Sequence, residues 1–302
     1  MDLSKLCGIV PPIVTPIDEN EKVNEAGFRK LLRHCVDVGI HSIFVAGTNG
    51  ETMGLTQTER NRAIKIALDE VSKDVPVICG AMDTSTSRVI ENIKAIEDMG
   101  GEVAVVTPPF YCKTPTEAEM INHFETVANA TKLKIMIYNI PGFTGTRVSN
   151  NELFKLAQID NIIGYKDSTG SFADFVKVLD HFKGTGFKVF QGMTDLAPMS
   201  LLMGADGFVP TLAPVYYELY LKLYNAAKAK DFNRVMELNH LVLESNRAAS
   251  FSKNGVVTNK YIVSTLGFFD YYPVKPSIGP TEEEKKKIDA FVQDIIEKSK
   301  TI

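Results

Sequence analysis

The sequence predicts an α/β protein of the (β/α)8 barrel class that carries a helical extension after its last strand. Short apolar runs rich in β-branched residues alternate with amphipathic stretches up to about residue 210, in eight units. After about residue 214 the pattern is helical throughout. The length of 302 residues accommodates one barrel, which commonly takes about 250 residues.

Eight runs have the length and composition of buried strands. Because helical stretches separate them, we expect parallel strands with helical crossovers, and eight such units close into a barrel. A doubly wound open sheet is the competing architecture, but no GxGxxG follows the first run, which disfavours the dinucleotide-binding form. The expected strands are 8–15, 42–46, 75–80, 103–107, 134–138, 161–166, 188–191 and 207–209.

Helix-start signals stand between these runs. Asn24 precedes an apolar stripe at helical spacing. Three hydroxyl residues are followed three positions later by glutamate, as in a capping box: Thr56 with Glu59, Thr116 with Glu119 and Ser149 with Glu152.

Beyond the last strand we expect only helices. Their ranges are 216–229, 232–249, 256–266 and, after Pro280, 281–298. No linker-like tract separates them from the barrel. Residues 1–213, the barrel core, and residues 214–302, the last barrel helix and the extension, are therefore expected to form one structural unit.

Composition limits the classes of function. The 33 basic and 37 acidic residues form no basic stripe, which disfavours nucleic-acid and polybasic membrane partners. No apolar run approaches the roughly 20 residues of a membrane span. Four scattered cysteines, without CxxC pairs or histidines at ligand spacing, argue against disulfides and a metal site. We expect a cytoplasmic protein with reduced thiols and a small, diffusible ligand.

Lys166 is the most informative residue, because it ends the run 161–166 and is followed at once by a polar turn. Active sites of parallel barrels lie at the carboxyl ends of the strands, so its amine is expected at the barrel mouth. Shielding from water lowers the pKa of a lysine and makes it a nucleophile toward a ketone. The resulting iminium is an electron sink for making or breaking the bond between the third and fourth carbons of a 2-oxo acid.

Two other strand ends bring polar groups to the same rim. Tyr138 can give and take a proton, and Thr48 can relay through its hydroxyl. The Gly-rich turn 47–50 offers backbone N–H groups to a carboxylate, so Thr48 and Asn49 are carboxylate-binding candidates. Plainer interpretations exist for each: a solvated rim lysine, a strand ended by proline, and a tight turn.

The order and spacing of these residues resemble the dihydrodipicolinate synthase/N-acetylneuraminate lyase family of class I, pyruvate-dependent aldolases, over essentially the full chain. Residues 12–16, 107–111 and 204–207 fit as well. The principal matches are Gly47-Thr48-Asn49-Gly50-Glu51 for G-[ST]-x-G-E, Tyr138-Asn139-Ile140-Pro141 for Y-N-x-P, and Gly164-Tyr165-Lys166-Asp167 for G-x-K.

This resemblance implies a TIM barrel, a homotetramer, and no cofactor beyond the covalent lysine imine. It implies that Lys166 forms the Schiff base, that Tyr138 transfers protons, and that Thr48 and Asn49 hold the pyruvate carboxylate. Thr48 would also link Tyr138 to a tyrosine from a neighbouring subunit, which is Tyr111, or Phe110 if the alignment shifts by one residue. Val209, at the end of the last strand, is a further substrate-binding candidate.

Two segments bear on the second substrate. Synthases of this family typically carry an arginine two residues after the Y-N-x-P proline, where this chain has Phe143. A benzyl ring cannot make a bidentate carboxylate contact, and Arg147, four residues on, is the alternative donor. Lys166-Asp167-Ser168 resembles the K-D-[ST] of 2-keto-3-deoxygluconate-type enzymes.

We therefore expect a lyase that joins pyruvate to a hydroxylated aldehyde, or the reverse, with a 2-keto-3-deoxy sugar acid or a sialic-acid-like substrate. Dihydrodipicolinate synthase, a sugar-acid dehydratase using the same iminium, and a non-catalytic pyruvate-binding barrel are the alternatives. Asp195 has the competing role of a helix cap. The candidates for a polyol tail are Ser168, Thr194, Asp195 and Thr211.

Overall fold

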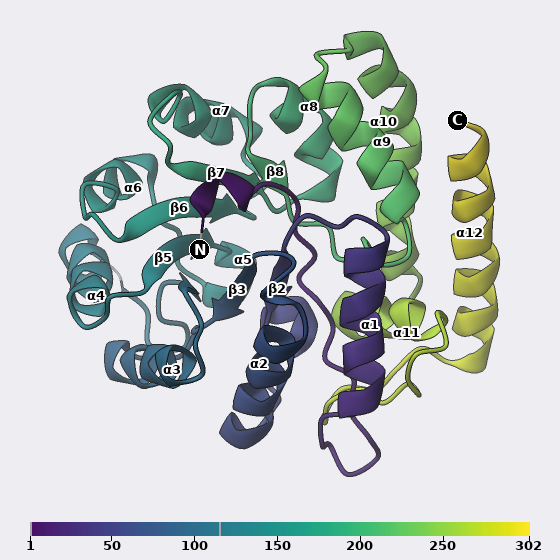
Figure 1. Cartoon of the computed structure of the whole chain (residues 1–302), viewed down its shortest axis with the longest axis horizontal. Helices are drawn as coiled ribbons and strands as arrows, with labels where there is room; N and C mark the ends of the chain where they lie inside the picture. The colour runs from purple at the N-terminus through teal and green to yellow at the C-terminus, as the bar shows by residue number, and fades with distance from the viewer. Residues whose placement is uncertain (1, 115) are drawn as a thin grey trace.

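The computed structural model describes residues 2–114 and 116–302 and confirms the (β/α)8 barrel with a C-terminal helical extension (Figure 1). The eight strands are parallel and pair in the order β1-β8-β7-β6-β5-β4-β3-β2. Backbone bonds from Phe44 N to Pro11 O and from Ile13 N to Phe44 O join the chain after β1 to β2. The sheet is therefore closed.

The strands are mostly shorter than the apolar runs that predicted them. The run 8–15 contains only a two-residue strand, because the chain beyond Ile9 pairs with β2 through single bonds around Pro11 and Pro12, which donate none. Two strands extend one residue beyond the predicted carboxyl end, one to Asn139 and the other to Asp167. The strands are β1 Gly8–Ile9, β2 Ile43–Val45, β3 Val77–Gly80, β4 Val103–Val106, β5 Lys134–Asn139, β6 Ile162–Asp167, β7 Lys188–Gln191 and β8 Gly207–Phe208.

Helices follow the strands around the outside of the barrel (Figure 1). Short 3-10 helices at Leu3–Lys5 (η1), Thr48–Gly50 (η2) and Thr194–Leu196 (η3) interrupt the connections. The α-helices up to the end of the barrel are α1 Glu25–Asp37, α2 Gln57–Val71, α3 Thr86–Asp98, α4 Glu117–Asn129, α5 Pro141–Thr144, α6 Asn150–Leu156, α7 Phe172–His181, α8 Ala197–Leu202 and α9 Tyr217–Lys228.

The extension consists of α10 Phe232–Asn246, the 3-10 helix η4 Arg247–Phe251, α11 Gly255–Ser264 and α12 Glu282–Thr301. The single helix expected over 232–249 is wrong at its end, because the chain changes from α to 3-10 geometry at Arg247. The α12 helix packs against α9 and α10. Within the described residues, no helix is both long and apolar enough to cross a membrane.

The predicted helix caps are confirmed with one exception. Thr116 with Glu119 and Ser149 with Glu152 form complete capping boxes. The Thr56 side chain caps α2 by accepting from Glu59 N, but the Glu59 carboxylate does not return the bond. It accepts from Val23 N at 2.7 Å instead, so it ties α2 to the loop before α1.

Alternation along the strands separates two cores. Residues such as Ala104 and Ile137 face the outer helices, whereas Val105, Met136 and Tyr138 belong to the cluster inside the barrel. Lys166 pairs in register with Tyr138 on the neighbouring strand. The interior of the barrel is thus filled by apolar side chains directly beneath the predicted catalytic residues.

Candidate active site

A cavity of about 250 Å³ lies over the carboxyl ends of the strands. Most of the residues predicted from the sequence line it, although they come from strands and loops far apart in the chain. The predicted residues in its wall are Thr48, Asn49, Tyr138, Phe143, Lys166, Ser168, Val209 and Thr211.

Lys166 lies at the floor of this cavity with only 3% of its surface exposed. Its Nζ lies 4.0 Å from the ring centroid of Tyr138 and 5.0 Å from that of Phe44. Burial lowers the pKa of Lys166 to about 7, because the charged ammonium loses its hydration. At neutral pH a substantial fraction of the amine is therefore neutral and nucleophilic.

Tyr138 is buried beside Lys166, and the hydroxyls of Thr48 and Ser168 lie near its phenol, where they offset part of the effect of burial on its pKa. Burial raises its pKa to about 12, so the phenol stays protonated at neutral pH. A protonated phenol between two hydroxyls can pass a proton along them in either direction.

Asn139 fixes the strand end that carries Tyr138. Its Nδ2 donates to Val148 O at 2.7 Å and to the Tyr165 hydroxyl at 2.8 Å, and its Oδ1 accepts from Val148 N at 3.1 Å. Gly192 follows β7, the other neighbour of β6. A larger residue cannot replace it without a shift, since its Cβ would lie 2.1 Å from the Ser168 Oγ. These contacts keep Tyr138 and Ser168 in place.

The turn after β2 is the 3-10 helix η2, and its first amides, those of Thr48 and Asn49, are of the kind that a helix start leaves without intrahelical acceptors. The Asn49 side chain is occupied: its Nδ2 donates to Pro12 O at 2.7 Å and its Oδ1 accepts from Asn259 Nδ2 at 3.0 Å. Asn49 therefore has its backbone N–H, rather than its side chain, to offer a carboxylate.

A buried ion pair supports the same turn from behind. Lys260 on α11 is fully buried, and its Nζ lies 2.9 Å from Glu51 Oε2. The Glu51 carboxylate also accepts from Val274 N. Glu51 has a positive φ of 54°, a conformation that costs free energy outside glycine and persists where contacts hold it. The extension thus fixes η2 through two adjacent residues, Asn259 and Lys260.

Two predicted polyol contacts lie outside the cavity wall. Thr194 is buried in η3, and exposed Asp195 accepts from Asn246 Nδ2 at 3.1 Å on the extension. Asp195 makes no capping bond either, so its alternative role as a helix cap is wrong. Both residues belong to η3, and neither lines the cavity at the barrel mouth.

Tyr111 and Phe110 have opposite environments. Tyr111 is 92% exposed and has a φ of 67°, whereas Phe110 packs against the cluster inside the barrel. Of the two, Tyr111 is the residue whose ring projects away from its own chain.

Phe143 lines the cavity and is 64% exposed, so an aromatic ring stands at the position where the motif resemblance implies an arginine in synthases. Arg147 does not replace it. Its guanidinium pairs with Asp174 at 2.6 Å and lines a different surface hollow. Within the described residues, Lys166 is the one charged side chain in the cavity wall.

Several lining residues were missed from the sequence. Pro12, Gly192 and Met193 follow strand ends, which was an available signal. Val256 and Asn259 come from α11, and nothing in the helical pattern indicates that this helix reaches the barrel mouth. The other missed residues are Ile140 and Gly142.

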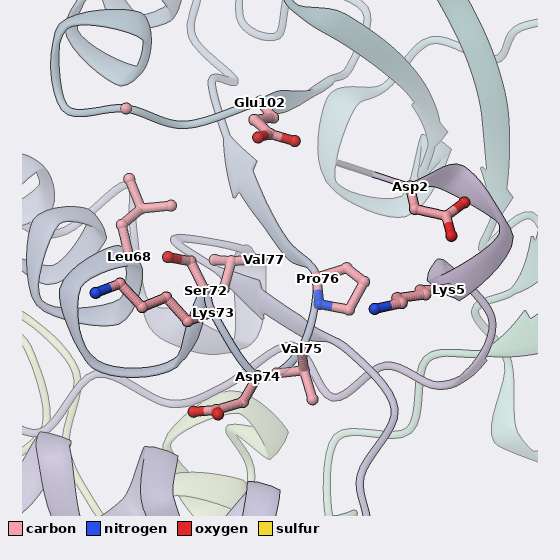
Figure 2. Close-up of a pocket in the computed structure, with 11 residues that line it drawn as sticks. Asp2, Lys5, Leu68, Ser72, Lys73, Asp74, Val75, Pro76, Val77 and Glu102 are labelled. Carbon is pink, nitrogen blue, oxygen red and sulfur yellow. The ribbon is translucent and has the colours of Figure 1, made fainter.

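A second hollow, of about 230 Å³, lies at the opposite end of the barrel (Figure 2). It is lined by Asp2 and Lys5 from the N-terminal segment, by the residues that lead into β3, and by Glu102 just before β4. None of the predicted site residues lies in its wall.

Comparison with known proteins agrees with the barrel fold and with the family resemblance of the motifs. The model of the "Dihydrodipicolinate synthetase family" matches residues 5–295. The chain belongs to the dihydrodipicolinate synthetase family. It is accordingly a lyase of that family, and the resemblance deduced from its motifs is confirmed at this level.

Relatives cover nearly the whole chain. The 4-hydroxy-tetrahydrodipicolinate synthase of Methanopyrus kandleri is 31% identical over 93% of this chain and 93% of its own. That of Bartonella bacilliformis is 31% identical over 95% of this chain and 97% of its own. The closer likeness to sugar-acid aldolases expected from the sequence finds no support in these names.

Solved structures of the family superpose closely. The dihydrodipicolinate synthase of Acinetobacter baumannii, complexed with pyruvate, has a TM-score of 0.89 at 29% identity, over 96% of this chain and 98% of its own. YagE of E. coli K12, a prophage protein of this family in complex with pyruvate, has a TM-score of 0.90 at 26% identity, over the same shares.

Proposed function

We propose that the protein is a pyruvate-dependent lyase that forms its imine at Lys166. The buried amine with a pKa of about 7 carries this proposal, because it combines a neutral nucleophile with an adjacent phenol. Pyruvate complexes of two structural relatives support the choice of 2-oxo acid.

The reaction follows from the groups around the amine. The Lys166 amine adds to C2 of pyruvate, and loss of water gives an iminium. Loss of a proton from C3, which passes along the hydroxyls beside Tyr138 to water, gives an enamine. The enamine C3 attacks the aldehyde carbon, and the proton returned along the same hydroxyls balances the one released. Tyr138 protonates the alkoxide that forms and recovers its proton through Thr48 or Ser168. Water then hydrolyses the iminium and releases product, so the proposed cycle takes no cofactor.

The amides of Thr48 and Asn49 hold the pyruvate carboxylate in this proposal. Their place at the start of η2 supports it, since a helix start presents unpaired N–H groups to anions.

The second substrate is proposed to be a neutral, hydroxylated aldehyde. Ser168, Thr211 and Asn259 supply neutral hydrogen-bonding groups to the cavity, whereas its wall holds no guanidinium among the described residues. A 2-keto-3-deoxy sugar acid is the corresponding condensation product.

4-Hydroxy-tetrahydrodipicolinate synthesis from pyruvate and aspartate semialdehyde is the second candidate. The names of the curated relatives favour this reaction over the sugar-acid substrate. Phe143 and the ion-paired Arg147 favour the neutral aldehyde, because neither offers a guanidinium to a second carboxylate.

One experiment separates these reactions. Borohydride reduction in the presence of pyruvate should add a pyruvyl group to Lys166, located by peptide mass spectrometry. A kinetic panel of glyceraldehyde, N-acetylneuraminate, 2-keto-3-deoxygluconate and aspartate semialdehyde then identifies the partner. We expect higher kcat/KM with the substrates whose aldehyde portion is neutral and hydroxylated than with aspartate semialdehyde. A dominant rate with aspartate semialdehyde would establish the second candidate, and an adduct on another lysine would refute both.

Tyr111 is proposed to complete the site of a neighbouring subunit in a homotetramer. Its 92% exposure and strained backbone support this role, because a large ring held in solvent gains a contact only from another chain. Tyr111→Phe should lower kcat about 10- to 100-fold while light scattering still reports a tetramer. A fully active monomer would contradict the proposal.

A further inference from the structure

Asn259 is a buried polar residue in the cavity wall that takes no part in the bond-making and proton-transfer steps above. It comes from α11, and only 6% of its surface is exposed. Its Oδ1 is buried and has no hydrogen-bond partner among the described residues. Of the buried side-chain atoms left unpaired in this way, it is the one whose residue lines the cavity.

The hydrogen bonds that link Pro12, Asn49 and Asn259 determine which side-chain atom of Asn259 has no partner. Pro12 O can only accept, so Asn49 must turn its Nδ2 toward it, at 2.7 Å. The Asn49 Oδ1 then faces Asn259 and requires a donor, which is the Asn259 Nδ2 at 3.0 Å. The remaining Asn259 atom is therefore the carbonyl oxygen, an acceptor.

A buried acceptor without a partner is unfavourable relative to a paired one. Because Asn259 lines the cavity, a hydrogen-bond donor that reaches this oxygen through a small shift of the side chain would be stabilised there. Pyruvate cannot meet it, because a carboxylate, a ketone and a methyl group contain no N–H or O–H. Once the ketone has become the iminium, the C–H bonds remain and the N–H lies at Lys166. Of the two substrates, the second is therefore the one that can bring a donor to this oxygen.

We propose that Asn259 is a specificity-determining residue whose Oδ1 accepts a hydrogen bond from a hydroxyl of the second substrate. This inference rests on the proposed function and deepens it, since it selects aldehydes that carry a hydroxyl over equally sized aldehydes that do not. Val256 lines the same cavity from the preceding turn of α11 and offers only an apolar surface.

The test is a cycle of two aldehydes and two variants at saturating pyruvate. Glyceraldehyde carries the hydroxyls, and propionaldehyde lacks them. Asn259→Leu keeps the branching of the side chain and removes both polar groups. It should lower kcat/KM for glyceraldehyde about tenfold more than for propionaldehyde, the effect of one lost hydrogen bond. Val256→Ala is the matched control and should change both aldehydes by a similar factor. Asn259→Ala serves where Asn259→Leu does not fold.

The outcomes are distinguishable. An equal loss for both aldehydes in the Asn259 variants would reduce Asn259 to a support for Asn49 and overturn the inference, with the proposed function intact as long as borohydride traps pyruvate on Lys166. Aspartate semialdehyde, measured as a third aldehyde, distinguishes a hydroxyl from an ammonium: if the Asn259 variants lose rate with this aldehyde alone, the donor is an ammonium and the hydroxyl assignment is wrong. Failure to trap pyruvate in the wild-type protein would remove the proposed function itself.

Discussion

Lys166→Met should abolish turnover and stabilise the fold at the same time. Methionine has a similar length and no amine, so no imine forms, and we expect kcat to fall by at least about 10⁴-fold, the scale seen when a covalent nucleophile is removed. Lys166→Arg is the control for charge, because a guanidinium remains protonated and cannot add to a ketone. Activity in either variant would rule out the imine mechanism.

The stability effect has a definite pH dependence. The pKa of Lys166 is about 7 when folded and about 10.4 when unfolded, so between these values the unfolded chain binds more protons and stability rises with pH. Below pH 7 the full penalty of the buried charge is present. Lys166→Met should therefore raise the unfolding free energy by a few kcal/mol at pH 6, with a difference that shrinks toward pH 10. Urea unfolding at both pH values measures it.

The same pKa governs the rate. The fraction of neutral Lys166 rises with pH through about 7, so kcat/KM for pyruvate should rise over that range and level off above it. An unshifted lysine would place this rise above pH 9, which a pH–rate profile distinguishes.

Most strands and helices could be predicted from the hydrophobic periodicity of the sequence. Parallel strands buried on both faces are continuous apolar runs, whereas the helices are amphipathic. What periodicity could not set is where pairing stops. The run 8–15 is apolar throughout, yet prolines at 11 and 12 leave only Gly8–Ile9 as strand. The α10 helix likewise ends at Asn246 although the helical pattern continues, and the chain goes on in 3-10 geometry from Arg247 to Phe251.

The residues of the site likewise fall into those that the sequence could predict and those that it could not. Residues at strand ends, such as Thr48, Tyr138 and Lys166, could be placed together because closure of the barrel brings all carboxyl ends to one rim. Asn259 could not, since its position depends on how the extension folds back over the rim. Asp195 shows the reverse error, because a polar residue after a strand need not face the mouth once η3 intervenes.

Because the extension folds back over the rim, we expect a substitution in α11, more than 200 residues after η2 in the chain, to lower the stability of the protein strongly. Lys260→Met should destabilise the protein by about 3–5 kcal/mol, because it leaves the Glu51 carboxylate buried without its cation. The pyruvate KM should rise as well, since Glu51 follows the amides that are proposed to hold the carboxylate. Lys287→Met is the matched control: Lys287 pairs with Glu283 on the surface, and its loss should cost less than about 1 kcal/mol.

A double variant separates the charge from the packing. Glu51→Gln with Lys260→Met removes both charges and leaves an amide oxygen for Val274 N, so most of the stability should return. If the double variant is as unstable as Lys260→Met, the shape of the lysine matters more than its charge. If the unfolding free energy of Lys260→Met lies within about 1 kcal/mol of the wild-type value, the buried ion pair contributes no more to stability than a surface pair does. In that case α11 would hold η2 through Asn259 alone.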